Sequence, residues 1–176
     1  VDDGVRAGGQ RRRHRARAGV KAQGAAMTSD ASGLQSGCPL CEGEGGAVVA
    51  RNDRLRVVRT DEGGFCAFYR VIWNAHVPEF SDLSATDRAH CMDAVTVVEQ
   101  ALRAELSPLK INLASLGNAV PHLHWHVIAR FDWDSHYPAP VWAAPRHEPP
   151  PATSAVVQGV LAARDALHRR IALALA

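Results

Sequence analysis

Short apolar stretches separated by turn residues dominate the chain after residue 46. The stretches 47–51, 55–59 and 65–73 have the length and the β-branched or aromatic content of strands, and turn sequences lie between them. Residues 109–116 and 122–131 form two more such stretches further along. Because short turns join the first three strands, we expect them to pair antiparallel in succession, as a meander.

Two other stretches repeat their apolar residues every three or four positions, which is typical of an amphipathic helix. One covers residues 84–106, with Ser84 as its predicted N-cap and Asp87 in its first turn, and Pro108 follows its end. The other covers residues 153–175, after a loop at 132–151 that contains several prolines and tryptophans. The pattern therefore predicts an α+β fold, in which one long helix lies between the strands of an antiparallel meander sheet and a second helix ends the chain.

Residues 1–36 lack this patterning and are predicted to form a disordered, basic extension ahead of a single domain at 37–176. Residues 1–26 hold seven lysines and arginines against two aspartates, whereas the rest of the chain has a net charge of −3. The charge therefore gives no indication of a specific nucleic-acid partner. Met27 is a candidate for the true start of the protein; a nucleic-acid-binding arm and a transit-like peptide are the alternatives for the residues before it.

The chain contains no run of about 18 apolar residues, the length that a membrane span needs. The basic extension lacks the apolar core of a secretory signal. We therefore expect a cytoplasmic protein without a membrane partner, in which the four cysteines do not form a disulfide framework.

The last predicted strand opens with His122-Leu-His124-Trp-His126. Side chains alternate between the two faces of a strand, so this spacing places all three imidazoles on one face. Groups with a near-neutral pKa on one face suit proton transfer, nucleophilic attack or metal binding. Three structural histidines in strict alternation is the weaker alternative.

A second candidate site begins at Cys38-Pro-Leu-Cys41, which has the spacing of a zinc knuckle but supplies only two ligands. A redox pair is the competing interpretation. His76, at the exit of the 65–73 strand, and one histidine of the triplet are the best candidates for two further ligands. A closed set of this kind would hold a structural metal.

The run His122-Leu-His-Trp-His-Val-Ile, together with Ile72-Trp-Asn-Ala-His-Val-Pro and the order of the elements over residues 38–131, resembles the histidine triad (HIT) superfamily of nucleotide hydrolases and transferases. The resemblance implies that His124 attacks the α-phosphorus of a nucleoside phosphate derivative, such as a dinucleoside polyphosphate or a phosphoramidate. A covalent nucleotidyl-histidine would form, and water or another acceptor would resolve it. The carbonyl of His122 would hold the other ring nitrogen of His124, and His126 would contact the phosphate oxygens.

The zinc-bearing branch of the superfamily resembles the chain at four positions, which implies a structural zinc, without an organic cofactor, on Cys38, Cys41, His76 and His122. The resemblance also implies a homodimer and a phosphate-binding role for Asn112, Gly117, Asn118 and Ala119. The chain departs from the family pattern at Ala119, where many members carry a hydroxyl group, and the turn before His122 is one residue shorter. Substrate preference therefore does not carry over directly.

Two other functions are compatible with the same residues. One is a nucleotide-binding or partner-interacting protein of this fold with little catalysis. The other is a metalloenzyme in which all three histidines of the triplet bind one metal, although the distal carboxylate of most such sites is missing. Among the remaining histidines, His136 and His147 fall in the predicted 132–151 loop and are expected at the surface.

Overall fold

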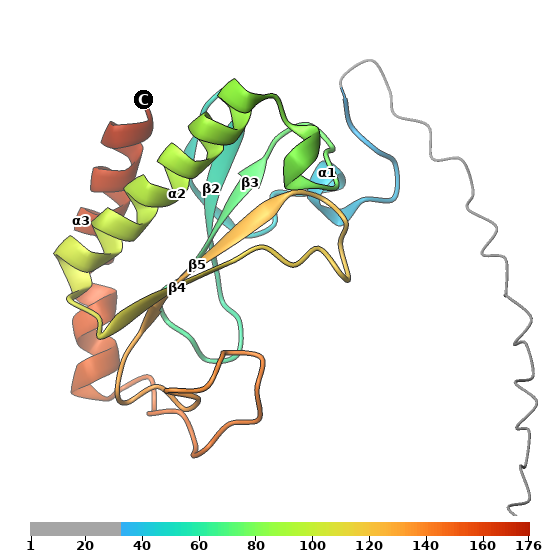
Figure 1. Ribbon diagram of the computed structural model, residues 1–176. Coiled ribbons are helices and arrows are strands. Elements are labelled where there is room, and N and C mark those ends of the chain that lie inside the picture. Colours follow the sequence, from blue (N-terminus) through green and yellow to red (C-terminus); the bar gives the residue numbers. More distant parts are fainter. Residues whose placement is uncertain (1–32) are drawn as a thin grey trace, which may run out of the picture.

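The computed structural model describes residues 33–176, so most of the predicted basic extension lies outside the described residues. A five-stranded antiparallel sheet forms the centre of the described region, in the order β1-β2-β3-β5-β4 (Figure 1). Its strands are β1 (Ala47–Arg51), β2 (Leu55–Thr60), β3 (Phe68–Trp73), β4 (Lys110–Ala114) and β5 (His124–Arg130). Strands β1 to β3 form the expected meander, and the predicted α+β class is confirmed.

Two long helices, α2 (Ala85–Leu106) and α3 (Ala155–Leu175), lie side by side over one face of the sheet (Figure 1). Apolar side chains of the sheet such as Val57, Val71 and Val127 are fully buried beneath them, in one core with Val95 of α2 and Ile171 of α3. Burying this face removes apolar surface from water, which stabilises the fold by about 25 cal/mol for each Å² buried. This burial is the main force that holds the helices to the sheet.

The start of α2 agrees with the sequence pattern. Ser84 is the N-cap residue, and its hydroxyl oxygen accepts a hydrogen bond from the backbone N–H of Asp87 at 3.1 Å. At the other end, Ser107 adopts a left-handed conformation with φ 46°, which terminates the helix directly before Pro108. The helix can therefore cross from β3 to the edge strand β4 without a long loop.

The second face of the sheet is covered by irregular segments. The short helix α1 (Pro39–Glu42) and the chain that follows it lie near β2 and β3, and the long connection between β5 and α3 lies at the far end (Figure 1). A 3-10 turn, η1 (Phe80–Asp82), links β3 to α2. This face therefore keeps room for polar side chains, and it carries the candidate site.

The strand predicted at 109–116 is shorter, at Lys110–Ala114, and two other differences from the predicted strand boundaries are informative. Strand β3 begins at Phe68 and not at residue 65, because Gly63 and Gly64 both have positive φ and extend the preceding turn. Strand β5 begins at His124, two residues later than expected. The backbone N–H of His122 donates to the carbonyl of Val120 at 2.8 Å, which turns this residue out of the ladder.

Within the part of the chain that the structure describes, none of the helices is long and apolar enough to cross a membrane.

Candidate functional site

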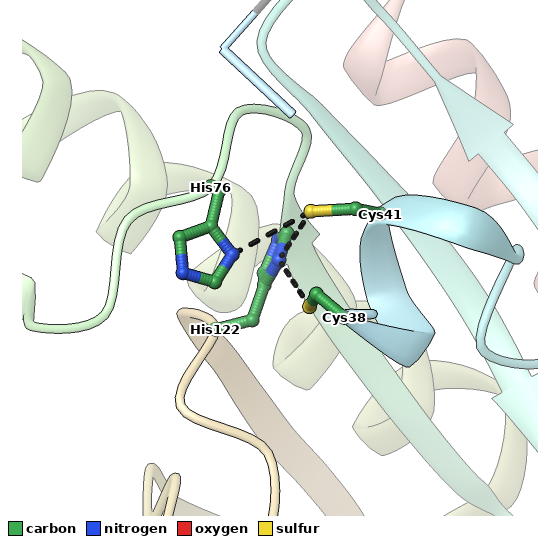
Figure 2. Close-up of side chains that lie close together, drawn as sticks. All are labelled: Cys38, Cys41, His76 and His122. Carbon is green, nitrogen blue, oxygen red and sulfur yellow. Dashed lines mark hydrogen bonds between the residues drawn. The ribbon is translucent and has the colours of Figure 1, made fainter. Parts of the chain in front are cut away.

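Four side chains from three distant segments meet at one end of the sheet (Figure 2). Cys38 and Cys41 come from the turn of α1, His76 from the chain after β3, and His122 from the chain before β5. Their possible ligand atoms all lie within 4.8 Å of one another, and in residues 33–176 they form the single group of three or more potential metal ligands. The predicted set of four is therefore brought together.

The distances within this cluster fit a tetrahedral metal. Nδ1 of His122 lies 3.4 Å from Sγ of Cys38 and 3.4 Å from Sγ of Cys41, and Nδ1 of His76 lies 3.5 Å from Sγ of Cys41. A tetrahedron with zinc bonds of about 2.3 Å to sulfur and about 2.0 Å to nitrogen separates S and N by about 3.5 Å. The residues therefore fit a zinc ion.

The orientation of His122 supports the same interpretation. Its Nε2–H donates to the carbonyl oxygen of Trp73 at 2.7 Å. A carbonyl can only accept, so in the neutral ring the lone pair resides on Nδ1, the atom that faces the cysteines. A second hydrogen bond of this kind is the usual way in which proteins orient a histidine that binds a metal.

His124 and His126 point to the second face of the sheet and form a pair of their own. Their ring centroids are 4.8 Å apart, and both side chains are buried. The Nδ1–H of His124 donates to the carbonyl oxygen of His122 at 2.6 Å, which is the hydrogen bond that the resemblance implied. Because the carbonyl can only accept, the lone pair of a neutral His124 lies on Nε2.

Burial keeps both imidazoles neutral. Desolvation lowers the pKa of His124 below its ordinary value, and a hydrogen bond to the His122 carbonyl opposes this only in part. Burial, and then the nearby His124 and Arg70, lower the pKa of His126 to about 4. In a neutral imidazole one ring nitrogen carries a proton and can donate a hydrogen bond, while the other carries a lone pair and can act as a nucleophile.

The sheet register shows which residues flank the pair. Across the sheet, Arg70 of β3 and Ala114 of β4 lie directly opposite His126. Nη2 of Arg70 donates to the carboxylate of Glu62, and Nη1 donates to the carbonyl of Gly45 at 3.3 Å. Arg70 was not among the residues predicted from the sequence, although a lone arginine between Tyr69 and Val71 was a visible signal.

A pocket of about 580 Å³ opens along β4, and neither His124 nor His126 is among its lining residues. Its lining includes Asn112, Ala114 and Ile128 on the histidine face of the sheet, and Val141 and Trp142 from the connection to α3. The ring of Trp142 lies 5.3 Å from that of His126 and is 52 % exposed. The pocket is large enough for a drug-sized or nucleoside-sized group.

A buried ion pair fixes this wall of the pocket. Arg130, at the end of β5, donates to both carboxylate oxygens of Asp134 at 2.8 and 2.9 Å, and to Oδ1 of Asn112 at 2.6 Å. Although burial alone would raise it, hydrogen bonds from Arg130 and from backbone N–H groups hold the pKa of Asp134 below its ordinary value. Neither charged residue was predicted from the sequence. Asp134 lies in a predicted loop, where acidic residues are common, and nothing in the sequence pairs it with Arg130.

The other predicted phosphate-binding residues lie in the connection between β4 and β5. Gly117 has a φ of 72°, which suits glycine, and Asn118 and Ala119 are exposed. In the same connection, the hydroxyl of Ser115, which was not predicted to take part in the site, donates to the carbonyl of His124 at 3.0 Å.

The expectation for His136 is wrong. Its side chain is buried, 5.1 Å from the ring of Phe65, and its Nδ1 lies 2.9 Å from the Ser135 hydroxyl. His147 is exposed, as expected. The difference arises because Asp134 binds the backbone N–H groups of the next residues and folds this part of the loop inward.

Comparison with known proteins shows the family and the fold of the chain. The HIT domain family matches residues 44–133, about half of the chain. A histidine triad protein from Bradyrhizobium japonicum is 28 % identical and covers 73 % of this chain and 92 % of its own, with a TM-score of 0.57. One from Sinorhizobium meliloti is 25 % identical over 73 % of this chain and 88 % of its own, with a TM-score of 0.55.

A histidine triad protein from Marinobacter aquaeolei supports the fold, with a TM-score of 0.56 and 21 % identity over 73 % of this chain and 93 % of its own. Among curated proteins, none matches the chain significantly. The five-stranded antiparallel sheet with its helices matches the fold of these histidine triad proteins. The chain belongs to the HIT family.

Proposed function

We propose that the chain is a nucleotide hydrolase or nucleotidyl transferase that acts at the α-phosphate of a nucleoside phosphate derivative, with His124 as the nucleophile. The observation that carries this proposal is the 2.6 Å hydrogen bond between Nδ1 of His124 and the carbonyl of His122. It fixes the tautomer and leaves a lone pair on Nε2, while burial keeps the ring unprotonated. A fixed, neutral imidazole is an activated nucleophile at neutral pH.

In the first step, the lone pair of Nε2 forms a bond to the α-phosphorus, and the bond from phosphorus to the leaving group breaks with its electron pair. The positive charge that develops on His124 is held by the His122 carbonyl. In the second step, water or another acceptor attacks the same phosphorus and loses its proton to the solvent. The P–N bond breaks with its electron pair returning to Nε2, and neutral His124 is regenerated. Dividing one displacement into two lowers the barrier of each.

His126 supplies a donor to the non-bridging phosphate oxygens. Its Nδ1 is buried and has no hydrogen-bond partner among the described residues. Buried polar atoms are normally paired, so this vacancy beside the nucleophile favours an atom of a ligand as its partner. Asn112 is proposed to contribute similarly from β4, because Arg130 occupies its Oδ1 and leaves its amide N–H groups for a phosphate oxygen.

The cluster of Cys38, Cys41, His76 and His122 is proposed to bind zinc. Bound there, zinc supplies a structural crosslink between α1 and the chain segments that flank β3 and β5. Because the cluster uses the side chain of His122 while His124 uses its carbonyl, the crosslink also stiffens the partner of the nucleophile. In the described residues the group of potential metal ligands contains His122 but not His124 or His126, so the arrangement does not favour one metal bound by all three histidines.

The test is a panel of adenylate donors with intact-mass detection of a nucleotidyl adduct. The panel contains a dinucleoside polyphosphate, a nucleoside phosphoramidate, an aminoacyl-adenylate and a sugar nucleotide. The parent protein is expected to turn over at least one of them and to show an adduct that His124→Ala lacks, while His90→Ala in α2 serves as the matched control. Nucleotide binding without turnover or adduct in the parent would instead support the non-catalytic binding protein.

A further inference from the structure

Arg70 supplies a positive charge on β3, the strand next to the one that carries the proposed phosphate site. The register pairs Arg70 with His126, and side chains directly opposite each other on neighbouring strands have Cβ atoms about 5 Å apart. Both therefore project from the same face, next to His124. Charge repulsion from Arg70 contributes, after burial and the nearby His124, to the lowered pKa of His126, which agrees with this proximity.

The guanidinium of Arg70 is only partly satisfied. Its two terminal nitrogens contact Glu62 and the carbonyl of Gly45. Its Nε is buried and has no hydrogen-bond partner among the described residues, which is also true of Nδ1 of His126 on the opposite strand. Each of these two nitrogens carries a desolvation cost that an oxygen atom of a ligand would relieve.

The existing partner of Arg70 is easily displaced. The side chain of Glu62 belongs to the turn between β2 and β3 and is 42 % exposed, whereas that of Arg70 is 19 % exposed. An ion pair with one exposed partner contributes little to stability, because water and salt screen it. A polyphosphate chain carries a negative charge on each of its successive phosphates and offers arginine pairs of acceptor oxygens in the geometry that the guanidinium matches.

We propose that Arg70 binds a second phosphate group, next to the α-phosphate at His124, so that the substrates of this site are nucleoside or dinucleoside polyphosphates. The inference rests on the proposed function of His124 and narrows it. In the free protein Glu62 neutralises Arg70; in the complex the phosphate chain replaces Glu62. When the bond from the α-phosphorus to the bridging oxygen breaks, its electron pair stays on the leaving polyphosphate, and Arg70 lies beside that charge.

A phosphoramidate with a small amine leaving group offers nothing to Arg70 beyond its single phosphate. The two substrate classes should therefore respond differently to loss of this cation. The experiment measures kcat/KM for diadenosine tetraphosphate and for adenosine 5′-phosphoramidate with the parent protein and with Arg70→Met. We expect the variant to lose about 30-fold with the tetraphosphate, as is typical of a lost charge-assisted hydrogen bond, and less than about 3-fold with the phosphoramidate.

Arg59→Met is the matched control. Arg59 is paired with Asp61 and its side chain is 14 % exposed, but strand alternation places it on the opposite, helix-covered face of β2. Arg59→Met should therefore leave kcat/KM unchanged for both substrates. Arg70→Lys keeps the charge and should retain part of the preference for the tetraphosphate, and Glu62→Gln should lower KM for that substrate alone.

Equal losses with both substrates, or a parent protein that turns over the phosphoramidate but not the tetraphosphate, would overturn the assignment of Arg70 and leave the proposed function of His124 standing. Absence of turnover and of any adduct throughout the panel would overturn the proposed function itself. If Arg70→Met does not fold, as judged by its thermal unfolding, the comparison of Arg70→Lys and Glu62→Gln with the parent decides the matter by the same criteria.

Discussion

Nη1 of Arg130 donates to Oδ1 of Asn112 at 2.6 Å, across the boundary between β5 and β4. Arginine has donors only, so the atom of Asn112 that faces it must be the oxygen. The amide nitrogen of Asn112 is thereby directed away from Arg130, on the face of β4 that borders the pocket. A residue at the end of one strand thus sets which chemical group its neighbour offers to a ligand.

Substituting Asn112→Asp should separate stability from activity. A carboxylate can still accept from Arg130, so the free energy of unfolding should change by less than about 1 kcal/mol. The variant loses the N–H donor and places a negative charge beside the phosphate, so kcat/KM should fall by about 100-fold. Steady-state kinetics and urea denaturation of the same preparation check both parts. A variant that is unstable and inactive to the same degree would contradict a phosphate-binding role.

Substituting Arg130→Met should be severely destabilising. It leaves the buried carboxylate of Asp134 without its partner, and breaking a buried pair in this way typically costs about 3–5 kcal/mol. Arg170→Met, which breaks the exposed pair with Glu105, should cost less than about 1 kcal/mol. Denaturant unfolding measures both.

The double variant Arg130→Met/Asp134→Leu tests the cause of that loss. If the unpaired charge is responsible, removing it should restore much of the stability that the single variant lost. No recovery in the double variant would instead assign the loss to packing of the 132–149 chain.

Metal analysis of the purified protein should find about one zinc per chain, because four protein ligands complete the coordination of a single structural zinc ion. Removing it with a chelator should lower the free energy of unfolding by at least about 3 kcal/mol, the stabilisation expected from a ligand present at 100 times its dissociation constant. Cys38→Ser should lose the metal, whereas Cys66→Ser, in the turn before β3, should keep it. Equal metal content in the two variants would rule out the proposed cluster.

Acid should weaken the fold through His126. The pKa of this ring is about 4 in the folded protein against an ordinary 6.5, so between these values the unfolded chain binds a proton that the folded protein excludes. Stability is therefore complete above about pH 6.5 and falls as the pH approaches 4, by about 3 kcal/mol in all. His126→Gln should flatten this part of the profile in urea titrations, whereas His147→Gln, an exposed histidine, should not. A profile unchanged by His126→Gln would refute the assignment.

The predicted homodimer is expected to use the edge strand β4. Its outer edge is unpaired in the described sheet, and Leu109 and Leu113 on or next to it are 61 % and 40 % exposed. Exposed edge strands with apolar side chains favour pairing with another chain. Light scattering should give twice the chain mass for the parent and a single chain mass for Leu113→Glu. A parent that remains monomeric at high concentration would exclude this interface.

The sequence predicted local secondary structure better than it predicted contacts between residues that are distant in the chain. Helix α2 was located to within one residue, because its apolar period and its Ser84 cap are both local signals. The start of β5 was missed by two residues, because the chain before it is held by backbone hydrogen bonds between Leu123 and both Val77 and Trp73, which are far away in sequence. Periodicity carries no information about such partners.

The same limit explains which site residues were found. His124 and the Cys38–Cys41 pair stand out by their spacing alone. Arg70 is recognisable as a charge in an apolar strand, but its position opposite His126 depends on pairing between β3 and β5, which helix α2 separates in sequence. Asp134 becomes meaningful only once Arg130 is known to be buried beside it.

The division of labour within His122 has a consequence for how such a protein can change over evolutionary time. Its ring faces the cysteines, but the group that holds His124 is its backbone carbonyl, which every amino acid possesses. A lineage could therefore replace this side chain, together with both cysteines, and still hold the nucleophile in the same tautomer. The metal site and the nucleophile are adjacent in space, yet the metal ligands can be lost in evolution without loss of the hydrogen bond that orients the nucleophile.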